Sequence, residues 1–183
     1  TTTIPPRTGR DNLMAMLHQL VASAAQAGTV SPGAGASGTD LAAGITQLRR
    51  IARKRGLVVV VSDFIAAPGW ERALRALTQR HEVLVAEVLD PRELELPAVG
   101  VLRIVDPESG RELEVQTNSA KLRARYAEAA AAQRAQIATA IRSAGVEHLQ
   151  VRTDHDFVGD IIRFVERRKA RRVGSARANG VIA

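Results

Sequence analysis

Two oxygen-bearing side chains stand at positions where a metal ion or ligand could bind. Asp63 follows the apolar run Leu57–Val61 after one serine, Ser62, and Thr39 begins the stretch TDLAAGI within SGTDLAAGI. Hydroxyl and carboxylate oxygens are ligands that Mg²⁺ accepts. Each residue also has a plain alternative, because aspartate often ends a strand in a turn and threonine often caps a helix. Position leaves both roles open for Asp63, whereas spacing alone favours a cap role for Thr39. Either Thr39 or Asp40 can cap the helix that follows.

No other polar residues form a recognisable catalytic set. The segment TDHDF, residues 153–157, has the side chains of a metal or acid–base cluster, but its place between a strand and a helix favours aspartate caps. His18, His81 and His148 are scattered, and Ser62 lacks the glycines of a nucleophile elbow. The sequence therefore predicts a protein that is not an enzyme, and it gives a metal-dependent hydrolase the least support.

The order of apolar patterns predicts an α/β fold. Four of the five residues in Leu57–Val61 are valine, which favours a strand buried on both faces. Helical spacing of apolar residues alternates with further strands. We expect helices over residues 11–26, 40–52, 71–80, 119–144 and 157–168, strands over 81–90 and 147–153, and a hairpin around 106–110. This order predicts a three-layer, doubly wound, mostly parallel sheet with one β-hairpin insertion.

The formal net charge of +7 is placed mostly at the end of the chain. Residues 167–183 hold six basic residues and no acidic one, which leaves +1 for residues 1–166. We therefore expect a folded region over 1–168 and a basic, flexible tail over 169–183. The tail keeps a basic nucleic-acid-binding protein as the alternative function, but the aromatic content of 3% disfavours a base-stacking surface.

Several segments together resemble a known family. SGTDLAAGI and RGLVVVVSDF are similar to parts of von Willebrand factor A-like domains. The chain resembles more closely the bacterial MoxR-associated domain of unknown function fifty-eight, in PPRTGRDNL, WERALRALTQRHEVLVAEVLDPRELELP, DPESGRELEV and RFVERR. The similarity extends from Pro5 to about Arg168.

The resemblance implies a metal-ion-dependent adhesion site built from three loops. Two of its ligands match Thr39 and Asp63, and the third loop carries an Asp-x-Ser-x-Ser motif that these 183 residues do not contain. In the family that motif lies upstream of the PPRTGR stretch, together with the first strand of the sheet. We therefore expect a partial von Willebrand A-like domain, in which Mg²⁺ binds to the complete domain rather than to this chain. The exposed sheet edges would favour self-association.

The resemblance also implies a function. Similar proteins act beside MoxR-type AAA+ ATPases, which predicts a non-enzymatic protein-interaction domain for complex assembly or chaperone-like work. We expect a cytoplasmic location, which suits a chain without cysteine, and membrane attachment only through an anchor upstream of Thr1. Nucleic acid is not expected as the main partner.

Overall fold

The computed structural model describes residues 3–5, 7–27, 40–105 and 112–179. The chain divides into two compact units. Unit 1 comprises residues 1–39 with 103–115, and unit 2 comprises residues 40–102 with 116–183. Thr39 and the predicted hairpin turn at 106–110 lie outside the described residues.

Unit 2 is built on a parallel sheet of three strands, β1 (Leu57–Ser62), β2 (Glu82–Leu89) and β5 (Glu147–Arg152). The strand order is β1-β2-β5, and both pairings are parallel. Parallel neighbours need a crossover between them, and helices supply it here. The structure thus confirms a mixed α/β fold with a parallel sheet.

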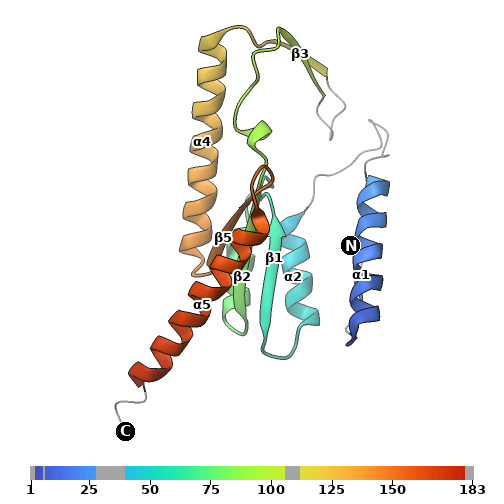
Figure 1. Ribbon diagram of the computed structural model, residues 1–183, viewed down its shortest axis with the longest axis vertical. Coiled ribbons are helices and arrows are strands. Elements are labelled where there is room, and N and C mark those ends of the chain that lie inside the picture. The colour runs from blue at the N-terminus through green and yellow to red at the C-terminus, as the bar shows by residue number, and fades with distance from the viewer. Residues whose placement is uncertain (1–2, 6, 28–39, 106–111, 180–183) are drawn as a thin grey trace. The chain divides into compact units, whose positions relative to one another are not determined.

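Four helices and a short 3₁₀ helix complete unit 2 (Figure 1). They are α2 (Leu41–Ile51), α3 (Trp70–Thr78), η1 (Pro91–Glu93), α4 (Ala120–Ser143) and α5 (Phe157–Asn179). The side chain of Asp40 accepts a hydrogen bond from the main-chain N of Ala43 at 2.8 Å, so Asp40, one of the two predicted candidates, caps α2. Ser119 caps α4 in the same way, through the main-chain N of Leu122.

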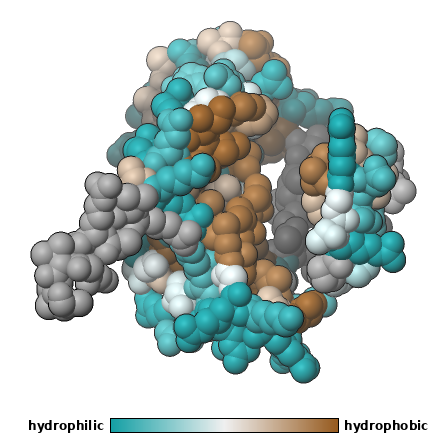
Figure 2. Space-filling view, turned by 60° about the horizontal axis from the view of Figure 1, so that its bottom comes forward, coloured by the Kyte–Doolittle hydropathy of each residue, from teal (hydrophilic) through white to brown (hydrophobic). Residues whose placement is uncertain are grey.

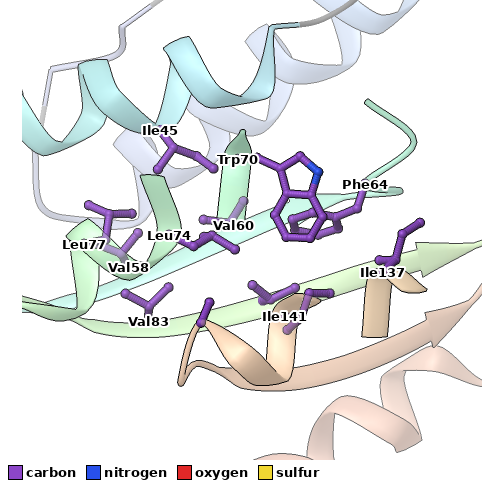
Figure 3. Close-up of a cluster of buried hydrophobic side chains, with 12 residues drawn as sticks. Ile45, Val58, Val60, Phe64, Trp70, Leu74, Leu77, Val83, Ile137 and Ile141 are labelled. Atoms are coloured by element: carbon purple, nitrogen blue, oxygen red, sulfur yellow. The ribbon is translucent and has the colours of Figure 1, made fainter. Parts of the chain in front are cut away.

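The core lies on one face of the sheet, beneath α2, α3 and α4 (Figure 3). Alternate residues of the strands, such as Val60 and Val85, point into it. Each helix adds apolar side chains spaced along one side, for example Leu74 and Leu77 of α3 and Ile141 of α4. Burial of these side chains holds three helices that are distant in sequence against one sheet.

The prediction that the valine strand is buried on both faces is wrong. Val58 and Val60 are each 8% exposed, but Val59 is 48% and Val61 66% exposed. The reason is that α2, α3 and α4 share one side, whereas α5 contacts the opposite face over β5. The outer face of β1 therefore stays exposed to solvent. Figure 2 shows in brown that apolar residues reach the molecular surface.

The final helix is longer than predicted. We expected it to end at Arg168, but α5 continues to Asn179. Residues 169–179 contain alanines and arginines, which are strong helix formers. On the β5 side, Arg168 forms ion pairs with Glu82 and with Glu147, at 2.6 Å for the latter, and so fixes α5 to the amino ends of two strands.

Unit 1 contains α1 (Arg10–Ala27), close to the predicted bounds. The apolar residues that predicted this helix, among them Leu13, Leu17 and Leu20, are exposed. The strands β3 (Val101–Val105) and β4 (Glu112–Gln116) form a separate two-stranded sheet, as expected for the hairpin.

Candidate functional site

Asp63 lies at the carboxyl end of β1, as predicted, and its side chain is exposed. Its Oδ1 accepts a hydrogen bond of 3.0 Å from the main-chain N of Ile65. The Oγ of Ser62 accepts another, also 3.0 Å, from the main-chain N of Phe64. The turn role left open by the sequence is therefore present. The metal role of Asp63 stays a prediction, and so does that of Thr39.

This turn contains a residue with unusual backbone geometry. Phe64 has a φ of 58° and is, among the described residues, the only one besides glycine with a positive φ. Its side chain is 1% exposed and packs edge-on against Trp70, with 5.0 Å between ring centroids. Left-handed backbone costs about 1–2 kcal/mol for a residue with a Cβ. Burial of the aromatic ring offsets that cost and fixes the loop in which Asp63 sits.

Arg134 of α4 connects the Asp63 loop to the rest of this end of the sheet. Its Nη1 donates a hydrogen bond of 2.7 Å to the main-chain oxygen of Asp63. Its Nη2 lies 2.8 Å from Oε2 of Glu93, and its Nη1 lies 3.5 Å from Oε1 of Glu87. One guanidinium group thus contacts three segments of the chain, which suits its rigid array of donors.

Glu87 is the centre of the cluster and is fully buried within β2. His148 Nε2 lies 2.8 Å from its Oε2, and Gln150 Nε2 donates to the same oxygen at 3.0 Å. Burial by itself would raise the pKa of Glu87. The hydrogen bonds from His148 and Gln150, with the electrostatic interactions of His148 and Arg134, outweigh burial and hold the pKa below its ordinary value.

Glu87 was not predicted as a site residue, although one signal in the sequence marks it. In HEVLVAEVLD, the inward positions of the strand are Val83, Val85, Glu87 and Leu89, so alternation alone places a carboxylate in the core. A buried carboxylate requires partners. No pattern in the sequence identifies them, because Arg134 and His148 are far from Glu87 along the chain.

The cluster is suited to holding elements together rather than to nucleophilic chemistry. A carboxylate that orients a histidine is part of many catalytic sets, but such sets also need a nucleophile beside the histidine. Among the described residues, the side chain of His148 contacts Glu87 instead, within a group that joins α4, β2 and β5. We interpret the cluster as a structural group that holds α4, β2 and β5 together at the carboxyl end of the sheet.

The TDHDF segment has the structural role that the sequence favoured. Asp156 Oδ1 accepts a hydrogen bond of 3.1 Å from the main-chain N of Gly159 in the first turn of α5. Arg152 forms a bidentate salt bridge with Asp154: its Nε donates to Oδ1 at 3.0 Å and its Nη2 donates to Oδ2 at 2.9 Å. This hydrogen bonding from Arg152 lowers the pKa of Asp154. Within the described part of the chain, neither aspartate belongs to a group of side chains able to hold a metal ion.

The metal-ligating side chains of the described residues do not cluster. None of them fall into a group of three or more histidine, cysteine, aspartate or glutamate side chains able to hold a metal ion. Asp63 offers one exposed carboxylate, and a protein site for Mg²⁺ needs further oxygen ligands or retained water.

These features define an α/β protein with a parallel three-stranded sheet and a buried ionic cluster at its carboxyl end. A family model described as protein of unknown function DUF58 matches residues 1–136. The chain belongs to this family, which confirms that part of the predicted resemblance.

The chain is also similar to mycobacterial proteins. It is 47% identical over 168 residues to the uncharacterized protein Rv1480 of Mycobacterium tuberculosis, covering 92% of this chain and 50% of that protein. It is 44% identical over 168 residues to the uncharacterized protein MAV169 of Mycobacterium avium, covering 92% of this chain and 95% of that protein. The chain thus spans about half the length of relatives such as Rv1480. No solved structure matches it.

A bilayer-spanning helix would need about 20 predominantly apolar residues. Within the described ranges, no helix has both the length and the apolar character required to cross a membrane.

Proposed function

We propose that this chain is a non-enzymatic protein-interaction module of von Willebrand A-like type that works with a MoxR-type AAA+ ATPase in complex assembly. The observation that carries the proposal is an exposed apolar surface on unit 2. It combines the outer face of β1, including Val59 and Val61, with exposed side chains of α5 such as Val158 and Ile162. Large exposed apolar areas mark protein interaction sites.

The sheet register places these elements on the same side. Val61 pairs with Ala86, and Ala86 pairs with Leu149, so the three side chains form one row across the outer face. Leu149 is buried at the end of that row and lines one cavity with Phe164 of α5. The row is therefore covered at β5 and exposed at β1.

The free edge of β1 adds to this surface. In the described part of the chain, β1 is an end strand of its sheet. An end strand presents unpaired main-chain groups that can accept a further strand. We propose that a partner covers this edge and the adjacent apolar face, and that Asp63 and Thr39 supply Mg²⁺ ligands once the domain is complete.

The proposal is tested by calorimetry and size-exclusion chromatography of the chain with a purified MoxR-type ATPase, with and without Mg²⁺. We expect a complex that Val59→Lys with Val61→Lys weakens. Ile51→Lys is the matched control, because Ile51 is similarly exposed but lies on α2. Failure to form a complex under any of these conditions would reject the proposal.

A further inference from the structure

Unit 2 carries a second surface, dominated by positive charge. Eight arginine and lysine residues lie between positions 49 and 80, against only two acidic residues, Asp63 and Glu71. All eight basic side chains are exposed. They lie on α2, in the loop after α2, on α3 and just after α3, and we call them the basic face: Arg49, Arg50, Arg53, Lys54, Arg55, Arg72, Arg75 and Arg80. Although residues 1–166 have a net charge of only +1, much of their positive charge lies on this one surface.

Contacts within unit 2 place these residues side by side. Helices α2 and α3 pack against each other. Arg80 Nη1 donates to the main-chain oxygen of Arg53 at 3.4 Å, which joins the end of α3 to the loop after α2. Arg75 Nη2 donates to the main-chain oxygen of Ser143 at 3.1 Å. These acceptors are carbonyl groups, so the hydrogen bonds do not neutralise the guanidinium charges.

Among the described residues, the carboxylates near the basic face form hydrogen bonds with main-chain groups rather than ion pairs with its arginines. Glu71 Oε2 accepts from the main-chain N of Gly69 at 2.8 Å, and Asp63 accepts from Ile65. The ion pairs that unit 2 forms among its described residues use other arginines, those at positions 134, 152, 163, 168 and 171.

A groove of about 260 Å³ lies on this face between α2 and α3. Its lining includes Arg49 from α2 and Arg72 from α3. The other lining residues are small or uncharged: Ala42, Thr46, Gly69, Ala73 and Ala76. Small side chains allow a polypeptide to approach the helices closely, while two arginines offer paired donors for carboxylates.

We infer that the basic face binds an acidic segment of a partner protein, with its carboxylates at Arg49 and Arg72. This surface is separate from the apolar face of β1, and the inference does not depend on the ATPase partner. The charge pattern favours an acidic segment over nucleic acid for two reasons. Residues 1–166 have a net charge of only +1, so a long polyanion would meet acidic residues beyond the basic face. Both aromatic residues of this stretch, Phe64 and Trp70, are buried and cannot stack on bases.

The test measures binding of the whole chain to a fluorescent poly-glutamate peptide at low and at physiological salt. A single-stranded oligonucleotide of equal charge and vesicles of anionic lipid serve as competing probes. We expect peptide binding that falls with salt and becomes about tenfold weaker in the Arg49→Gln, Arg72→Gln variant, since charge-assisted hydrogen bonds are lost.

The matched control is Arg163→Gln with Arg171→Gln, which removes two exposed arginines of α5. Retained peptide binding in this control supports the inference, whereas an equal loss in both variants shows a net-charge effect and overturns it. Tighter binding of the oligonucleotide or of the vesicles also overturns it, as does no peptide binding at low salt. If the first variant unfolds at lower urea, Lys54→Gln with Arg55→Gln tests the same face from the loop.

Discussion

Arg134 Nη1 donates a hydrogen bond of 2.7 Å to the main-chain oxygen of Asp63, although the two residues are 71 positions apart. The same nitrogen lies 3.5 Å from Oε1 of the buried Glu87. The loop that holds the proposed metal ligand is thus fixed by a cation whose charge also balances the core carboxylate. Substitution of Arg134 should therefore change both the stability of the protein and the geometry of the Asp63 loop.

We expect Arg134→Met to lower the free energy of unfolding by about 2–3 kcal/mol, because it removes charged hydrogen bonds and leaves Glu87 with fewer partners. Urea unfolding measures the change. In a Glu87→Gln background the same substitution should cost clearly less, since the buried charge is gone. Arg163→Met, which breaks only an exposed pair with Asp160, should cost no more than about 1 kcal/mol. Equal costs for Arg134→Met in both backgrounds would contradict coupling to Glu87.

The pH dependence of stability should show the lowered pKa of Glu87. The folded pKa lies below the ordinary value of 4.5, so the unfolded chain binds the proton more readily. The stabilisation is therefore complete above about pH 4.5 and is lost as the pH falls through the folded pKa. Urea unfolding between neutral and acid pH should show this loss in the wild type and a flatter profile in Glu87→Gln. Asp154→Asn is the control. Asp154 also has a lowered pKa, but it is exposed, so this substitution should change the pH profile less than Glu87→Gln does.

At Phe64 the usual order of glycine and alanine should be reversed. Either substitution loses the buried ring and should cost about 3–5 kcal/mol. Glycine normally costs more than alanine, but at a φ of 58° it avoids the left-handed strain. We expect Phe64→Gly to be about 1 kcal/mol more stable than Phe64→Ala. An ordinary helical site, such as Ala73 in α3, should show glycine as the worse residue.

Much of the fold could be predicted from local patterns, because each pattern reports one element. The valine run predicted the strand β1, and candidate caps such as Asp40 predicted where helices begin. The exposed outer face of β1 could not be predicted, since a continuous apolar run does not show which faces other elements cover. The same holds for the Glu87 cluster, where one inward carboxylate was visible in the sequence but its partner Arg134 was not.

The candidate site was predicted only in part. Asp63 lies where the pattern placed it, and its turn hydrogen bond is present. Its part in a metal site rests on the resemblance, as does that of Thr39. The basic face was not predicted as one surface, because α2 and α3 bring arginines together that are separate along the chain.

Asp63→Asn should change stability little in this chain. Asparagine keeps an Oδ1 that can accept from the main-chain N of Ile65, so we expect a change within about 0.5 kcal/mol. Calorimetric titration with Mg²⁺ should show no binding above background for this chain, because one carboxylate gives little affinity. In a protein that also contains the Asp-x-Ser-x-Ser loop, the substitution should weaken Mg²⁺ binding. Strong Mg²⁺ binding by the present chain would contradict this assignment.

The free edge and outer face of β1 should make the chain self-associate as concentration rises. Val59 and Val61 are largely exposed beside an end strand, and such strands pair readily with other chains. Lysine at these positions points into solvent and opposes pairing by charge, so Val59→Lys with Val61→Lys should keep the chain monomeric without unfolding it. Val60→Lys should instead unfold the protein, because Val60 faces the core. Sedimentation velocity over a range of concentrations, with circular dichroism of each variant, measures both effects. Self-association that persists unchanged in the double lysine variant would show that another surface is responsible.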